Sequence, residues 1–224
     1  MSRISAVCVV HALLPDPGQD PDTTAIDKRP VEGAVAVDEH GLAGDTQVDR
    51  KHHGGTFQAV YAYADEDAAW WAEQLGREIP AGRFGENVRT TGLDVTGAVI
   101  GERWQVGRAG VGPLLEVTAP RIPCTTFQTF LDEPRWVKRF TQAGRPGAYL
   151  RVLAEGRVGQ GDTVAVVHRP QHGVTIGDVF PTGDAAVMRR LSEGADADGI
   201  ELSPPLRKRV RAALREERRA ADGA

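Results

Sequence analysis

Cysteine is scarce in this chain of 224 residues, which contains only Cys8 and Cys124. Two thiols are too few for a disulfide scaffold or for a zinc site built from four thiolates. Long apolar runs are also missing, since none approaches the roughly 20 residues that a membrane helix needs. The N-terminus lacks the long apolar centre and the cleavage site of a signal peptide. We therefore expect a cytoplasmic protein without membrane contact, in which both cysteines remain thiols.

A strong charge of one sign is absent as well, since the formal net charge is −4, with 41% hydrophobic and 26% charged residues. These fractions are typical of a soluble globular protein, and the net charge argues against one built around nucleic acid. Positive charge is nevertheless concentrated in residues 207–219, where seven Lys or Arg stand against two Glu. This segment carries +5, which leaves −9 for the rest of the chain. Leu206, Val210 and Leu214 recur every four residues, so we predict an amphipathic helix whose charged face is solvated.

The central part of the chain is rich in short β-favouring runs that are separated by glycine. A helix is predicted from Asp65 to Gly76, because three acidic residues begin it and a glycine ends it. Strands and helices do not alternate, which disfavours a doubly wound parallel sheet. We expect an α+β fold, predominantly β, with a main domain over residues 1–168 and a small helical appendage over residues 169–224. The clearest strand candidates are residues 99–106, 114–118, 148–153 and 163–167.

Three loop segments hold most of the residue types that perform chemistry. Each contains glycine or proline and adjoins a predicted strand, and such loops are where a rigid scaffold displays functional groups. The segments are Lys51-His52-His53-Gly54-Gly55 with Gln58, Phe84-Gly85-Glu86-Asn87, and Pro120-Arg121-Ile122-Pro123-Cys124-Thr125.

Cys124 is the stronger functional candidate of the two thiols, because Cys8 lies in an apolar run and is expected to pack in the core. Two prolines make the approach to Cys124 rigid, and Arg121 stands close to it in the sequence. A rigid thiol beside a guanidinium suits a soft metal whose other ligands are anionic. A cysteine nucleophile, a zinc site shared with His52 or His53, and a buried loop cysteine remain alternatives.

In their order along the chain, five motifs resemble the MOSC-domain family, which is named after the C-terminal domain of molybdenum cofactor sulfurases. The motifs are His-His-Gly-Gly at 52–55, Gln58-Ala59-Val60, Phe84-Gly85-Glu86-Asn87, Pro120-Arg121-Ile122-Pro123-Cys124 and Gly144-Arg145-Pro146-Gly147. The resemblance covers roughly residues 25–168, and the tail resembles the three-helix appendage of stand-alone bacterial members. It implies a mixed fold similar to a β-barrel that binds the molybdenum cofactor, molybdopterin, a pterin dithiolene carrying a phosphate.

The resemblance also implies roles for individual residues. It makes Cys124 the protein ligand to molybdenum and places Asn87 and His53 in the same cavity. We choose His53 over His52 because it directly precedes the two glycines. In the implied mechanism His53 relays a proton, and Asn87 holds the substrate or an oxo ligand. The other expected cofactor contacts are Lys51, His52, Gln58, Phe84, Glu86 and Arg121.

The activity that the resemblance implies is the reduction of small N-hydroxylated compounds, as in the detoxification of N-hydroxylaminopurine-type bases. Because the sequence has no flavin or iron–sulfur signature, the electrons would come from an external donor protein. A second interpretation is a cofactor carrier or sulfur-transfer protein with a persulfide on Cys124. A third is a nucleic-acid module that acts through residues 207–219. The sequence leaves a homodimer open.

Overall fold

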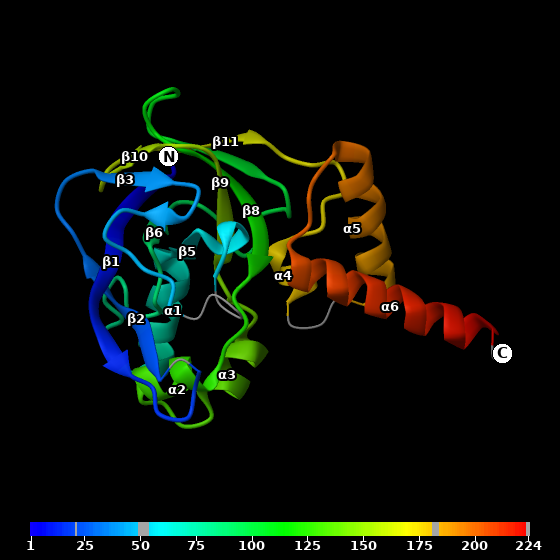
Figure 1. Ribbon diagram of the computed structural model, residues 1–224, viewed down its shortest axis with the longest axis horizontal. Helices are drawn as coiled ribbons and strands as arrows, with labels where there is room; N and C mark the ends of the chain where they lie inside the picture. Colours follow the sequence, from blue (N-terminus) through cyan, green and yellow to red (C-terminus); the bar gives the residue numbers. More distant parts are fainter. Residues whose placement is uncertain (21, 49–53, 181–183, 223–224) are drawn as a thin grey trace.

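A large sheet of eight strands forms the centre of the molecule (Figure 1). The computed structural model describes residues 1–20, 22–48, 54–180 and 184–222, and the side chains of the last helix as far as residue 219. The strand order is β11-β7-β8-β9-β5-β6-β1-β2, and neighbours are antiparallel except for the parallel pair β5 and β6. The strands are β1 (Arg3–Pro15), β2 (Thr23–Pro30), β5 (Val60–Ala64), β6 (Val88–Thr91), β7 (Arg103–Val106), β8 (Leu114–Pro120), β9 (Ala148–Ala154) and β11 (Val164–His168).

The expected α+β fold with mostly β structure is confirmed, but the sheet is not closed into a barrel, because β11 and β2 are its edges. A bridge between Arg3 and Thr163 brings the start of β1 beside the start of β11. The amide of Ile4 also donates to the carbonyl of Asp162 at 2.8 Å. No longer ladder joins β1 to β11 within the described residues. A second, three-stranded sheet has the order β10 (Gly156–Val158), β3 (Val35–Asp38), β4 (Gly41–Leu42).

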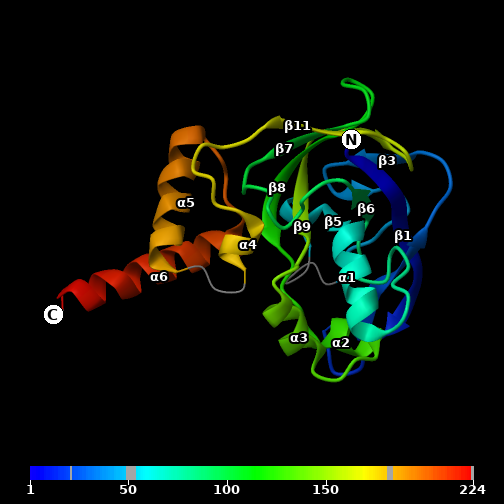
Figure 2. The same ribbon diagram turned by 180° about the vertical axis from the view of Figure 1, so that it is seen from behind.

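Three helices, α1 (Asp65–Leu75), α2 (Thr125–Leu131) and α3 (Trp136–Ala143), lie together on one side of the large sheet (Figure 2). The helix predicted from Asp65 is confirmed as α1, which ends at Gly76 in the left-handed conformation that glycine permits. Three acidic residues lie in its first turn, where they stabilise the positive end of the helix dipole.

An aromatic cluster joins these three helices to the sheet. Its centre consists of the fully buried rings of Trp71, Phe84, Phe127, Trp136 and Phe140. The ring centroids of Trp71 and Trp136 are 4.4 Å apart, and those of Phe127 and Trp136 are 5.4 Å apart. Such rings bury large apolar areas and prefer defined mutual angles. The cluster therefore fixes the position of α2 and of Cys124, the residue that caps its N-terminus.

A further set of helices follows β11, which ends at His168, and packs against a different part of the sheet (Figure 1). These helices are α4 (Ile176–Val179), α5 (Ala185–Asp198) and α6 (Pro204–Asp222). Ile176, Leu191 and Leu206 belong to the same hydrophobic cluster as Ile4 and Trp104 of the sheet. The hydrophobic core is thus continuous from the sheet into the C-terminal helices.

The amphipathic helix predicted near the C-terminus is confirmed as α6. Leu206 and Val210 are buried, and Leu214 is partly buried against the same core. Among the helices that the structure describes, none combines the length and the apolar character that crossing a membrane requires.

The strand predicted at residues 99–106 is shorter than expected, because β7 begins at Arg103. The chain turns at Gly101, whose φ is +85°. A Cβ atom on Gly101 would lie 2.5 Å from Cδ1 of Ile200, in the connection between α5 and α6. The glycine therefore permits both the turn and the close approach of the C-terminal helices.

A buried ion pair holds the loop that precedes β6. Glu86 is fully buried, and its carboxylate accepts hydrogen bonds from the amides of Gly82 (2.8 Å) and Phe84 (2.9 Å) and from Nε of Arg89 (2.7 Å). The guanidinium of Arg89 is also buried, and its second carboxylate contact, Asp65 at 3.7 Å, is partly exposed. Glu86 therefore neutralises Arg89 and fixes the loop between Gly82 and Asn87.

Replacing Glu86 with alanine should lower the free energy of unfolding by about 3–5 kcal/mol, because Arg89 keeps a buried charge that Asp65 compensates only in part. Urea denaturation followed by tryptophan fluorescence measures this change. The matched control is Arg29→Ala, which breaks the ion pair between Asp27 and the Arg29 guanidinium, whose side chain is 59% exposed. This control should lower the free energy of unfolding by less than about 1 kcal/mol. Equal losses in the two variants would contradict a structural role for Glu86.

Candidate functional site

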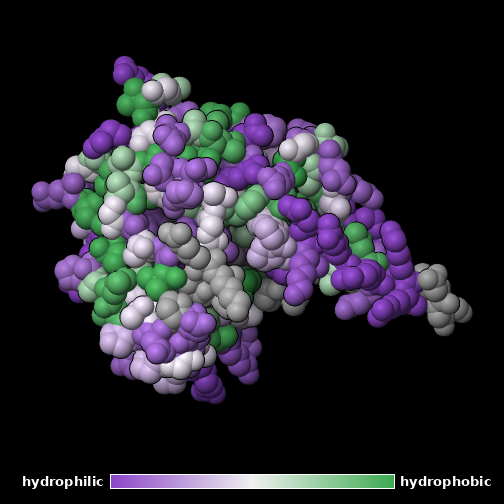
Figure 3. Space-filling model, in the orientation of Figure 1, coloured by the Kyte–Doolittle hydropathy of each residue, from purple (hydrophilic) through white to green (hydrophobic). Residues whose placement is uncertain are grey.

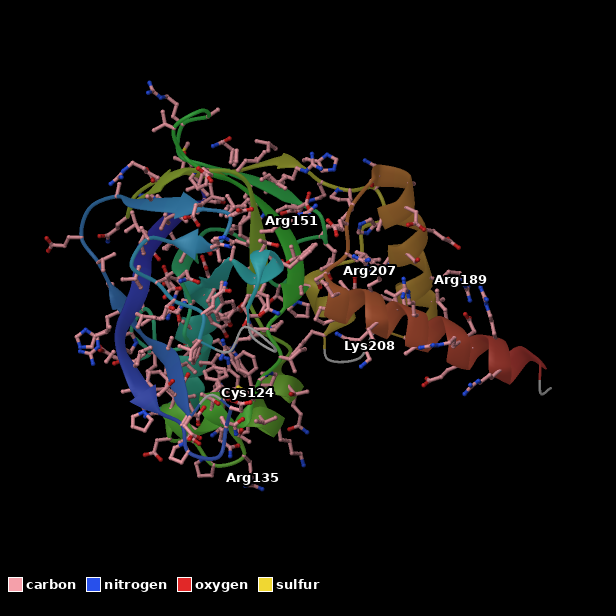
Figure 4. The ribbon with its side chains drawn as sticks, viewed as in Figure 1. Cys124, Arg135, Arg151, Arg189, Arg207 and Lys208 are labelled. Carbon is pink, nitrogen blue, oxygen red and sulfur yellow. The ribbon has the colours of Figure 1, made fainter. Side chains whose placement is uncertain are left out.

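A cavity of about 150 Å³ opens where α2 meets the large sheet, and Cys124 lies at it. Figure 4 shows Cys124 close to α2 and α3. Four of the predicted site residues line this cavity together, namely Cys124, Arg121, Asn87 and Gln58. Further lining residues that the sequence did not single out include Lys28, Asp45, Gln47, Tyr61, Tyr149 and Asp16.

Cys124 sits at the start of α2 in an extended conformation, with φ −131° and ψ 175°. Its carbonyl accepts the amide of Gln128 at 3.1 Å, so the backbone of Cys124 belongs to the first turn of the helix. The side chain is partly exposed, and the residue forms no disulfide. The rigid loop that the two prolines predicted therefore holds a thiol at the cavity.

Arg121 is a buried cation beside this thiol. Its guanidinium carbon lies 4.4 Å from the ring centroid of Phe127 and 5.2 Å from that of Tyr61. Burial acts to lower the pKa of Arg121, but Tyr149, Tyr61 and Cys124 outweigh it and raise that pKa above its ordinary value. Within the described part of the chain, Arg121 forms no ion pair, and its Nε has no hydrogen-bond partner. The guanidinium hydrogen-bonds to the phenol of Tyr149, but no described carboxylate lies within ion-pair distance, so its positive charge suits an anionic ligand in the cavity.

A polar network of three side chains lies along another wall of the cavity. Nζ of Lys28 lies 2.6 Å from Oδ2 of Asp45, and Nδ2 of Asn87 donates to the same oxygen at 2.7 Å. The other carboxylate oxygen of Asp45 accepts the amide of Val10 at 3.1 Å, and Oδ1 of Asn87 accepts the amide of Tyr61 at 3.0 Å. Both the oxygen and the nitrogen of the Asn87 side-chain amide therefore form hydrogen bonds within the protein.

Burial and the contact with Asp45 both change the pKa of Lys28. Burial lowers its pKa below the ordinary value of 10.5, and the Asp45 carboxylate partly restores it. The sequence held one signal for Lys28, since alternate residues of a strand share a face and Lys28 stands two residues after the apolar Ile26. No comparable signal marked Asp45, which lies in a loop after Gly44.

Of the remaining predicted site residues, only Gln58 is seen to line the cavity in the described part of the chain. Gln58 lines the cavity, and its buried Oε1 has no hydrogen-bond partner among the described residues. Phe84 and Glu86 lie behind the cavity wall, in the aromatic cluster and in the Arg89 ion pair, and neither lines the cavity. Their predicted contact with a cofactor stays a prediction. Lys51, His52 and His53 lie outside the described residues.

The two thiols lie in different environments, because Cys124 lines the cavity and Cys8 does not. Cys8 is fully buried in β1, and burial, assisted by the negative charge of Glu86, raises the pKa of its thiol to about 12. Cys8 therefore packs as a small apolar residue, as predicted. Within the described ranges, no three His, Cys, Asp or Glu residues gather as metal ligands. The alternative zinc site would need His52 or His53, which those ranges do not include.

Comparisons with known proteins identify relatives of this chain. The profile of the MOSC domain matches residues 49–165. The protein YflK of Bacillus subtilis is 33% identical over 186 residues, which cover 80% of this chain and 82% of YflK. A protein of Gibberella moniliformis named "Reductase" is 34% identical over 151 residues, 66% of this chain but 26% of that protein. The crystal structure of YiiM from Geobacillus stearothermophilus superimposes with a TM-score of 0.76 at 26% identity, covering 96% of this chain and all of that one.

Replacing Asp45 with asparagine tests the polar network. The amide keeps an acceptor for Asn87 but removes the charge that stabilises the Lys28 ammonium, so the pKa of Lys28 should fall further. The unfolded chain then binds this proton more tightly than the folded protein does, and stability rises with pH up to the ordinary lysine pKa. Asp45→Asn should therefore lose about 3 kcal/mol near pH 7, and less near pH 10.

Urea denaturation at several pH values measures the difference from the unmodified protein. Asp27→Asn, which affects the exposed pair with Arg29, is the control and should show a small loss that does not change over this range. A loss in Asp45→Asn that stays constant with pH would refute the proposed coupling to Lys28.

Proposed function

This chain belongs to the MOSC domain family, and we propose that it reduces N-hydroxylated compounds with the help of a bound molybdenum cofactor. MOSC domains are associated with this cofactor, which supports the general part of the proposal. The observation that carries the proposal is the buried guanidinium of Arg121 beside the Cys124 thiol, with no described carboxylate within ion-pair distance. A cation of this kind suits an anionic, sulfur-rich ligand.

The residues at the cavity fit the chemistry of such a group. Cys124 would supply a thiolate, a soft ligand suited to molybdenum in a sulfur-rich environment. Arg121 would neutralise anionic sulfur or phosphate, and its unpartnered Nε would gain an acceptor. The buried, unpartnered Oε1 of Gln58 would accept a hydrogen bond from a ring N–H of the pterin. When bound, the cofactor supplies the two-electron redox chemistry, which no side chain can provide.

The polar network would provide a proton at the cavity. Reduction of a hydroxylamine, R–NHOH, to the amine and water consumes two electrons and two protons. Lys28 holds a proton at Nζ, and because burial lowers its pKa, the ammonium releases this proton more readily than an ordinary lysine. Asp45 holds Lys28 in place, and Asn87 holds Asp45 in turn. Asn87 thus acts as a positioning residue, while the relay expected of His53 stays a prediction.

The name and length of one relative support a reductase that works with another protein. The Gibberella moniliformis relative is named "Reductase", and about a quarter of its length matches this chain. Most of that protein therefore lies outside the segment that resembles this one. We infer that the electrons reach the present chain from a separate donor protein.

Cys124→Ser should abolish molybdenum binding and reductase activity, because a serine hydroxyl is a hard and weakly acidic ligand. The measurements are elemental analysis, pterin fluorescence and reduction of N-hydroxylaminopurine by reduced methyl viologen, on protein from a host that makes the cofactor. Cys8→Ala is the matched control and should keep both properties, because Cys8 lines no part of this cavity.

Unchanged molybdenum content and activity in Cys124→Ser would rule out the ligation. Unmodified protein that lacks both molybdenum and pterin, and that carries one additional sulfur atom on Cys124 by mass spectrometry, would favour the sulfur-transfer alternative instead.

A further inference from the structure

Helix α6 carries a stripe of cations along one face. Lys208, Arg211, Arg215 and Arg218 are all exposed, and their spacing of three or four residues places them on the same side of the helix. In the described part of the chain no carboxylate forms an ion pair with any of the four. Figure 3 shows hydrophilic residues gathered over this helix. We call these four residues the cationic stripe.

The packing of α6 fixes the direction in which the stripe points. Leu206 and Val210 are buried in the core, so the face that bears them cannot turn outward. Glu217 lies off the stripe and pairs with Arg189 of α5. Part of the stripe lines a shallow groove together with Pro204 and Arg207. Neither Glu216 nor Glu217 lines this groove, which is lined by cations and Pro204.

A chain of contacts connects this surface to the rim of the cavity. Arg207 lies 3.5 Å from Glu201, and the same carboxylate lies 3.2 Å from Arg151 on β9. The guanidinium of Arg151 lies 5.1 Å from the ring centroid of Phe57, the residue before the cavity-lining Gln58. Figure 4 shows Arg207 and Lys208 on α6 and Arg151 on the neighbouring part of the sheet. The first turn of α6, where the stripe begins, is therefore linked to the rim of the cavity through packed side chains.

We propose that the cationic stripe of α6 is the docking surface for an acidic electron-transfer protein that delivers electrons to the cavity. This inference rests on the proposed function, because that reaction needs an external donor. In each turnover the donor protein is oxidised by two electrons, while R–NHOH and two protons become R–NH₂ and water. Complementary charge accelerates the formation of short-lived complexes, which suits a donor that must bind, transfer and leave.

The composition of α6 favours an acidic protein over a nucleic acid. From Pro204 to Asp222 the helix has no aromatic residue on which a base could stack and no Asn or Gln side chain that could read adenine. The rest of the chain carries −9, which would repel a long polyanion that extended beyond the helix. A compact acidic surface meets less of this repulsion, because it need not extend beyond α6.

The test combines charge reversal on the stripe with two electron donors. In the stripe variant Lys208, Arg211 and Arg215 become Glu; in the control variant Arg29, Arg108 and Arg135, all exposed and outside α6, become Glu. Reduced flavodoxin is the acidic donor, and reduced methyl viologen is a small donor that needs no docking surface. With cofactor-loaded protein at low salt, the stripe variant should lose about tenfold or more in kcat/KM for flavodoxin. It should keep its rate with methyl viologen, and the control variant should keep both rates.

Binding of fluorescently labelled flavodoxin, measured by anisotropy at low and high salt, tests docking independently of turnover. Binding that weakens with salt and is lost in the stripe variant supports the proposal, even if methyl viologen drives no reduction and the proposed function fails. Equal flavodoxin binding by the unmodified protein and the stripe variant would overturn it. Stripe-dependent binding of duplex DNA without flavodoxin binding, or a dimer that the stripe variant dissociates, would assign the surface to nucleic acid or to a second copy instead.

Discussion

The contact between Arg121 and the rings of Phe127 and Tyr61 joins the candidate site to the core of the protein. Phe127 belongs to the aromatic cluster that positions α2, and Tyr61 belongs to β5 in the middle of the sheet. A guanidinium is able to stack on aromatic rings while its edge stays available for hydrogen bonds. The cluster can therefore hold a charge at the cavity without an acidic partner. The thiol of Cys124 gains its fixed position from the same packing, since it precedes the helix that carries Phe127.

The opposite wall of the cavity depends on strand order. Lys28 lies on β2, Asn87 directly precedes β6, and β1 runs between these two strands. Asp45 comes from the loop after β4 and completes the network by accepting hydrogen bonds from both side chains and from the amide of Val10 in β1. Polar groups from four segments thus satisfy one another near one edge of the sheet. Such a network holds its members rigidly only when every partner is present.

Local signals in the sequence predicted part of this arrangement. The acidic first turn and the terminal glycine predicted α1, and the repeat of Leu206, Val210 and Leu214 predicted α6. The proline-rich approach to Cys124 predicted a rigid loop. Lys28 and Asp45 were missed because their contact depends on how the loop after β4 folds against β2. Phe84 and Glu86 belong to a recognisable motif, but a motif does not distinguish side chains that face a ligand from those that support the loop behind it.

The continuous core also bears on how the protein is made. Ile4 in the first strand packs in the same hydrophobic cluster as Leu206 and Val210 of α6. The backbone around Arg3 also pairs with Thr91 in β6 and with Thr163 beside β11. When β1 leaves the ribosome, its hairpin partner β2 follows closely, but β6, β11 and α6 still have to be synthesised. Contacts of such long sequence separation form slowly and leave apolar strands exposed in the meantime. Final folding must therefore wait until α6 has emerged, and the nascent sheet depends on protection from aggregation until then.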